Sequence, residues 1–208
     1  MQLNLDQYHD PKMGKDFSRS LQRLKSLTSL NSSFQDETGF GVSGSTFRAY
    51  TGYSAKPSLV FRKWARKQFH TILTTSSPSR FTSQNQFDNW HKGLSRSLQQ
   101  HWATQQKRSL SFAQLHKLID LFIKWLSTLD FGKPLFTESL VKFANCALDS
   151  KTLSKLNQCY SMALPIRSPS MGDIHSEVTY KFCQNLIRSF TKKYGGTALL
   201  FDFYGWGD

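Results

Sequence analysis

The sequence lacks the features that mark membrane and secreted proteins. It contains no run of about eighteen or more apolar residues, which argues against a transmembrane helix. The opening residues, MQLNLDQYHDPKMGKD, contain no apolar signal-peptide region. Cys146, Cys159 and Cys183 form no CxxC pair, and an odd number of cysteines without a secretion signal indicates reduced thiols. We therefore expect a cytoplasmic protein.

Several catalytic motifs are also missing. There is no glycine-rich phosphate loop ending in Lys-Ser or Lys-Thr, so ATP hydrolysis is unsupported. His175 and Glu177 spell the first half of a zinc-deaminase signature, but its P-C-x-x-C half is absent. The remaining histidines and cysteines are too scattered for a zinc site. We expect neither a metal nor another cofactor.

Acidic residues are scarce. The chain has 14 Asp and Glu against 27 Lys and Arg, which gives a net charge of +13. Basic proteins bind nucleic acid because their cations release the counterions condensed on it. The charge therefore favours a nucleic-acid partner, while acidic membrane or protein surfaces remain alternatives.

Helical spacing of apolar residues dominates, and it predicts an all-α, compact fold. Residues 31–58 are rich in Gly, Ser and Thr and read as a loop or a small hairpin, and residues 197–208 read as an apolar strand or turn. We expect one domain, or two packed helical lobes joined near 102–110, with a basic part over 1–102 and a second group of helices over 109–208. Helices are expected over 14–30, 59–73, 83–102, 111–126, from Thr137, after Asp149 and over about 173–194.

The expected helix over 59–73 is both basic and aromatic. Its cations are candidates for DNA phosphates, while its aromatic rings could stack on bases or simply face the core of the protein. The first possibility assigns DNA binding to Arg62, Lys63, Arg66 and Lys67.

The expected helix over 111–126 is apolar around most of its circumference, as a buried helix is. It nevertheless carries Lys117 and Lys124, seven residues apart and therefore on nearly the same side. An unpaired ammonium in a protein core is costly, so each lysine needs a partner or a route to water. Lys117 could extend to water, or it could form an ion pair with Asp120 one turn away.

The helix has the pattern K-x-x-D-x-x-x-K-W, and it is followed by ALDSKTL, by SPSMGDIHSEVTY and by FDFYGW. Over about 83–208 this arrangement resembles small bacterial proteins related to helix-hairpin-helix DNA glycosylases, including an antiphage branch that excises modified bases. Asp120 replaces the more usual Asn, and Ala147 replaces a Pro. The hairpin signature Leu-Pro-Gly-Val-Gly is absent, so the sequence lacks the motif with which the hairpin of this superfamily usually binds phosphate.

The resemblance implies a helix-hairpin-helix glycosylase-like fold and a catalytic carboxylate at a helix N-terminus, a place that Asp149 occupies. It implies a nucleophilic lysine, for which Lys117 is the first candidate and Lys124 the second. The interval from Lys117 to Asp149, 149 − 117 = 32 residues, is similar to that of an archaeal oxidised-guanine branch. The expected partner is double-stranded DNA with modified bases, bound by a monomer. Further expected contacts are Lys151 and Arg167 for DNA, and Asp120, Trp125, Tyr204 and Trp206 for the base.

Base excision requires a carboxylate, and in some enzymes also a lysine, which are the two groups assigned here to Asp149 and Lys117. Cleavage of a glycosidic bond passes through an oxocarbenium-like sugar, which a nearby carboxylate stabilises. A lysine can attack C1′ only as the neutral amine, a form that burial among apolar neighbours favours. The alternatives are that Asp149 is only a helix cap and that the chain binds nucleic acid without catalysis. A toxin or adaptor that acts on protein or acidic membrane is a third class.

Overall fold

The computed structural model describes residues 5–28, 39–75, 79–165 and 168–207, and these residues form an all-α fold without strands, as predicted. Arg167 and the first part of the predicted loop lie outside the described residues. The helices are α1 (Pro11–Leu27), α2 (Pro57–Thr74), α3 (Gln84–Gln105), α4 (Phe112–Leu126), α5 (Pro134–Phe143), α6 (Ser150–Cys159), α7 (Glu177–Lys193) and α8 (Ala198–Trp206), with short 3-10 helices over Leu5–Tyr8, Gly44–Ala49 and Met171–Asp173.

Most of these helices begin where a side chain caps them. Ser83, Ser111 and Asp149 cap α3, α4 and α6, and each accepts hydrogen bonds from backbone N–H groups of the first turn. The sequence predicts the cap at Ser83, and it offers Ser109 or Ser111 for α4 and Asp149 or Ser150 for α6. Asp10 caps α1 with Pro11 in the first turn, so this helix starts three residues before the predicted residue 14. A first-turn proline also starts α5 at Pro134, which makes the predicted start at Thr137 wrong.

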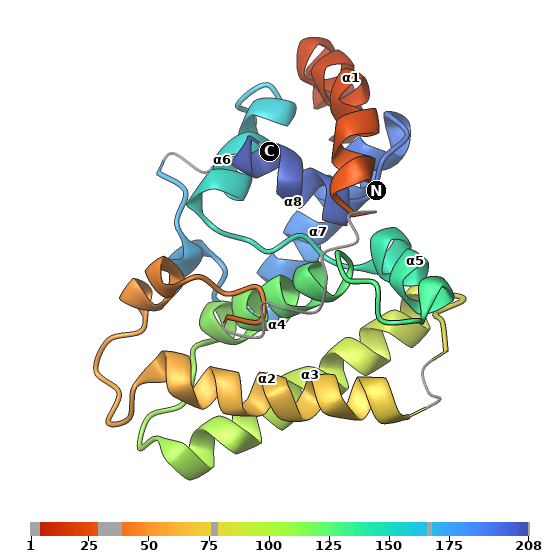
Figure 1. The fold of residues 1–208 in the computed structure, drawn as a ribbon. Helices are drawn as coiled ribbons and strands as arrows, with labels where there is room; N and C mark the ends of the chain where they lie inside the picture. Colours follow the sequence, from red (N-terminus) through yellow and green to blue (C-terminus); the bar gives the residue numbers. More distant parts are fainter. Residues whose placement is uncertain (1–4, 29–38, 76–78, 166–167, 208) are drawn as a thin grey trace.

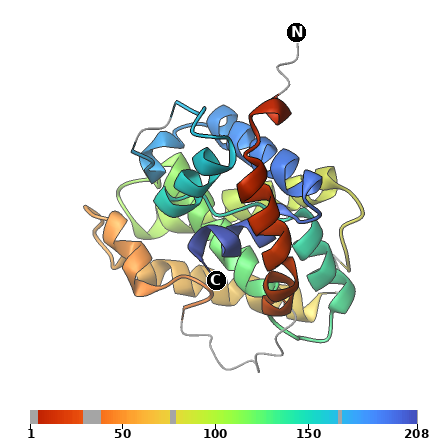
Figure 2. The same ribbon diagram turned by 90° about the horizontal axis from the view of Figure 1, so that it is seen from above.

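The helices form two packed groups. In Figure 1, α2 and α3 lie side by side below α4, while α8 occupies the middle of the upper group. In that group α8 packs against α1, α5, α6 and α7, and Figure 2 shows α1 crossing in front of α8. The helix α1 therefore joins the C-terminal helices rather than α2 and α3, although it belongs to the basic half of the sequence.

The prediction of a strand or turn at residues 197–208 is wrong, because this segment forms α8. Thr197 caps the helix by accepting the N–H of Leu200, and Gly207 ends it with a positive φ. Buried side chains lie all around α8. A helix that is apolar on every side has no amphipathic periodicity, so its pattern could not be distinguished from that of a buried strand.

The part of the predicted loop that the structure describes, residues 39–58, contains the 3-10 helix Gly44–Ala49 and no hairpin. Gly41 has a φ of +78°, and a Cβ atom there would lie 2.4 Å from Cβ of Trp125. A glycine is therefore required for this segment to lie directly on α4. Within the described ranges, no helix is long and apolar enough to cross a membrane.

Candidate functional site

Lys117 and Asp149 meet at the junction of the two groups of helices. The Lys117 Nζ atom lies 3.3 Å from Oδ2 of Asp149, and the exposed fractions of the two side chains are 15% and 6%. Lys117 is held by the buried helix α4, and Asp149 is held at the start of α6. The structure thus brings together the two residues that the sequence singled out for chemistry.

The two oxygens of Asp149 have different partners. Oδ1 accepts the N–H groups of Lys151 and Thr152 at 2.9 and 3.0 Å, which is the helix cap. Thr152 completes the capping box by accepting the N–H of Asp149 through its hydroxyl oxygen. Oδ2 is left to face Lys117. The cap fixes the orientation of the carboxylate and leaves one oxygen for the lysine.

Lys124 has a separate partner, Asp202 of α8, which the sequence analysis did not identify. Its Nζ atom lies 2.5 Å from Oδ1 of Asp202 and 3.9 Å from the centre of the Phe203 ring. The other oxygen of Asp202 accepts the N–H of Ala147 at 2.6 Å. Burial raises the pKa of Asp202, while Lys124 and the Ala147 N–H act in the opposite direction.

The short segment Ala147–Asp149 connects the two ion pairs. Ala147 is tied to Asp202 and Asp149 is tied to Lys117, so both lysines of α4 find carboxylates along the same line of the helix. This explains why a buried helix carries two ammonium groups on one side. We call Lys117, Lys124, Asp149 and Asp202 the lysine–aspartate cluster.

Asp120 does not pair with Lys117, so the ion pair expected within α4 does not form. Its carboxylate is buried and accepts the Tyr180 hydroxyl at 2.7 Å, and it lies 2.8 Å from Nε2 of His91. Both oxygens are therefore occupied by residues of α3 and α7. Asp120, which the sequence predicted to contact the base, instead orients His91 and Tyr180.

Trp125 is also placed differently from the expected base pocket. Its ring packs edge-on against Phe40 and Phe69, at centroid distances of 5.3 and 5.0 Å, and it stacks against Phe122. Trp125 follows Lys124 by one residue, which turns it by roughly 100° around the helix toward α2. It is a packing residue.

The two aromatic residues expected near the end of the chain lie beside the start of α6. The Tyr204 ring is buried and its hydroxyl donates to Asp16 at 2.8 Å, whereas Trp206 is 43% exposed. Lys151 lies 4.1 Å from the Trp206 ring and Lys155 lies 4.8 Å from the Tyr204 ring. Lys155 was not identified from the sequence, although it lies one turn after Lys151. We call Lys151, Lys155 and Trp206 the α6 patch.

The cations of α2 form a different surface. Lys63, Arg66 and Lys67 are exposed and Arg62 is half-buried, while the aromatic residues Phe61, Trp64 and Phe69 face the core. Of the two predictions for the aromatic rings of this helix, the one that places them in the core is therefore confirmed. In Figure 1, α2 lies on the other side of α4 from α6, so these cations are not neighbours of the α6 patch.

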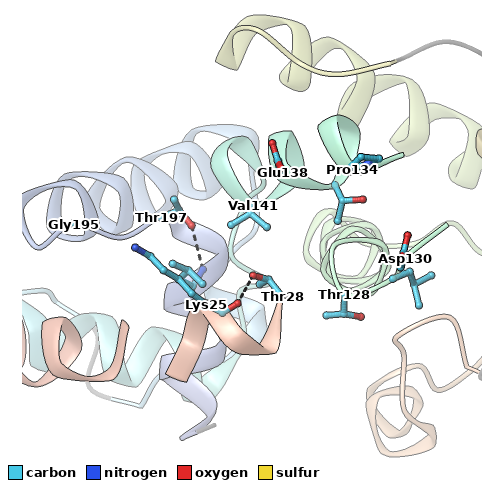
Figure 3. Close-up of a pocket in the computed structure, with 12 residues that line it drawn as sticks. Lys25, Thr28, Thr128, Asp130, Pro134, Glu138, Val141, Gly195 and Thr197 are labelled. Atoms are coloured by element: carbon cyan, nitrogen blue, oxygen red, sulfur yellow. Dashed lines mark hydrogen bonds between the residues drawn. The ribbon is translucent and has the colours of Figure 1, made fainter. Parts of the chain in front are cut away.

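A cavity of about 600 Å³ lies between the end of α1, α5 and the start of α8, and Figure 3 shows the residues that line it. Its threonines hydrogen-bond to their own helices: Thr28 and Thr137 donate to backbone carbonyls, and Thr197 caps α8. The hydroxyl groups of these three threonines are thus engaged at helix ends. We regard this cavity as a groove between helices.

No cluster of possible metal ligands occurs among the described residues. Searches against family models, curated proteins and solved structures returned no match for this chain. The geometry of the site is therefore the basis for its function. The buried carboxylate of Asp149 caps α6 and faces Lys117, and the α6 patch lies next to it.

Proposed function

We propose that the chain is a DNA glycosylase with a helix-hairpin-helix glycosylase-like fold, which excises a modified base from duplex DNA at the Lys117–Asp149 pair. The observation that carries this proposal is the 3.3 Å approach of Lys117 Nζ to the capping carboxylate of Asp149. A side chain that can attack and a carboxylate that can accept its proton are then within one hydrogen bond of each other.

In the proposed reaction, the target nucleotide leaves the duplex and places C1′ of its sugar at this pair. Asp149 accepts a proton from Lys117 as the lysine nitrogen bonds to C1′. The bond from C1′ to the base breaks, and the base leaves with the electron pair and takes a proton from water. If water attacks instead, Asp149 takes its proton and stabilises the developing positive charge on the sugar.

The α6 patch suits the strand that flanks the target nucleotide. Lys151 and Lys155 follow Asp149 on the first two turns of α6, where the helix N-terminus adds a favourable dipole for phosphate. Trp206 is exposed beside Lys151 and offers a face on which a base can stack. Lys124 and Asp202 hold the segment that carries Asp149 and so act as positioning residues.

The deciding experiment is excision by pure protein on duplexes with oxidised, alkylated, deaminated and glucosylated bases. We expect aldehyde-tagged abasic sites with the wild type, and at least about a hundredfold less product with Asp149→Asn. Asparagine caps helices as well as aspartate does, so this variant should fold. When the bound lysine nitrogen gives a proton to O4′ and the C1′–O4′ bond opens, the adduct becomes an imine. Borohydride should reduce this imine to a stable amine, and the trapped product should require Lys117. Full activity in folded Asp149→Asn would overturn the proposal.

A second candidate is a nucleic-acid-binding module without catalysis. It is favoured by the complete hydrogen bonding of Asp149, whose two oxygens serve a helix cap and an ion pair. This candidate predicts salt-dependent DNA binding, no aldehyde on any duplex, and unchanged binding in Asp149→Asn.

A further inference from the structure

A second cavity, of about 190 Å³, lies between α3, the start of α4 and α7, and neither Lys117 nor Asp149 lines it. An engineered cavity of about 150 Å³ holds a benzene molecule, so this one has room for a ring of nucleobase size. We call it the histidine cavity, after His91 and His116 in its wall.

Flat rings form one side of the histidine cavity. His116 stacks on Phe112 at a centroid distance of 4.1 Å, and its ring lies 4.7 Å from that of Tyr180. Asp120 binds the Tyr180 hydroxyl and faces His91, so these two rings are held in place from behind. The two faces of His116 are covered by Phe112 and by His91, whose ring centroid lies 5.3 Å away, so a flat heteroaromatic group meets this fixed aromatic wall at the ring edges.

His116 also offers an unused polar atom. Its Nδ1 atom is buried and has no hydrogen-bond partner among the described residues. Burial lowers the pKa of His116 to about 4, so the ring is neutral at pH 7. A neutral imidazole can accept a hydrogen bond from the edge of a base or donate one to it, according to its tautomer.

The positive charges at the cavity are only partly neutralised. Lys92 and Lys181 both pair with Glu177, at 3.6 and 2.7 Å. Arg188 is half-buried and donates to the side chain of Asn145, and no carboxylate of the described residues forms an ion pair with it. A guanidinium that is held in place without a carboxylate is a suitable partner for phosphate.

We propose that the histidine cavity binds one nucleotide unit, with the base against Phe112, His116 and Tyr180 and the phosphate at Arg188. The site is separate from the lysine–aspartate cluster and does not rest on the proposed excision chemistry. The unit is either a free mononucleotide or an unstacked nucleotide of a single strand, since both present the same ring and phosphate.

The test is calorimetric titration of the full chain with the four deoxynucleoside monophosphates, the matching nucleosides, inorganic phosphate and a short single-stranded oligonucleotide. We expect the nucleotides to bind more tightly than either the nucleosides or phosphate. Arg188→Gln should weaken nucleotide binding about tenfold or more and leave nucleoside binding nearly unchanged. His116→Phe keeps the ring stack but removes the nitrogen, and it should weaken both. If the oligonucleotide binds more tightly than the mononucleotides, the natural ligand is a nucleotide within a single strand rather than a free mononucleotide.

Two controls separate this site from the rest of the protein. Arg23→Gln removes an exposed cation of α1 outside the cavity and should leave the affinity unchanged. Asp149→Asn should abolish excision while nucleotide binding persists, so the two proposals can fail independently. In the wild type, nucleotides should shift the imidazole NMR signals of His116, which checks the site without a variant. Equal affinity for inorganic phosphate, no binding at millimolar nucleotide, or binding that survives both cavity variants would overturn the proposal.

Discussion

Asp149 faces Lys117 across an interval of 32 residues, and this contact joins the start of α6 to the middle of α4. The pair is shielded from water, so its two members depend on each other more than an exposed ion pair would. Loss of one member leaves the other as a largely buried group without its counter-charge.

This dependence predicts coupling in a double-mutant cycle. Lys117→Met should destabilise the protein by about 1–3 kcal/mol, because Asp149 loses its counter-charge. Asp149→Asn should cost less in the Lys117→Met background than in the wild type, with a coupling of about 0.5–3 kcal/mol. Urea unfolding of the four proteins measures this. Additive effects would show that the contact contributes nothing to stability.

Replacement of Asp202 should lower the free energy of unfolding more than replacement of an exposed acidic residue does. Asp202→Ala leaves the Lys124 ammonium and the Ala147 N–H without their acceptor, and should cost about 3–5 kcal/mol. Glu138→Ala, an exposed change on α5, should stay within about 0.5 kcal/mol. Thermal and urea unfolding compare the two variants. A cost for Asp202→Ala no greater than that for Glu138→Ala would contradict the description of Asp202 as a structural anchor.

The surface that meets DNA can be identified from the salt dependence of binding. If the α6 patch contacts phosphates, the double variant Lys151→Gln, Lys155→Gln should reduce the slope of log affinity against log salt by about two. The matched α2 variant Lys63→Gln, Lys67→Gln should leave the slope unchanged. Fluorescence anisotropy at several salt concentrations supplies both slopes. The reverse result would place the DNA on α2.

His116 should make folding stability depend on pH. Its folded pKa of about 4 lies below the ordinary value of 6.5, so the unfolded chain binds a proton that the folded chain does not. Stability from this group is present above pH 6.5 and is lost as the pH falls toward 4. The loss should amount to about 3 kcal/mol at most. His9, whose pKa burial also lowers, adds in the same direction.

Unfolding free energies of the wild type and His116→Phe at pH 7, 5.5 and 4.5 test this expectation. The variant should lose less stability on acidification than the wild type does. Parallel pH profiles for the two proteins would show that His116 is protonated in the folded state as readily as in the unfolded one.

Much of the fold could be predicted because its signals are local. The caps Ser83, Ser111 and Asp149 are short polar residues placed directly before amphipathic segments, and a cap depends only on its own helix. The α2 rings Trp64 and Phe69 are buried, as the amphipathic alternative required.

The rest depends on contacts between distant segments. Lys117 has Asp120 one turn away, yet it pairs with Asp149, because His91 and Tyr180 from two other helices occupy Asp120. No local pattern contains that information. The sequence does not single out Asp202, because this residue lies in an apolar run whose pattern predicts a strand or a turn. A lone acidic residue within such a run was the available signal, since a buried charge needs a partner.

The central place of α8 also bears on the order in which the protein is made. It follows every other described helix in the sequence, yet α1, α5, α6 and α7 all pack around it. During synthesis these four helices leave the ribosome before the helix that they surround. Lys124 can pair with Asp202 only after α8 has been synthesised, so the lysine–aspartate cluster is completed after the other described helices have left the ribosome.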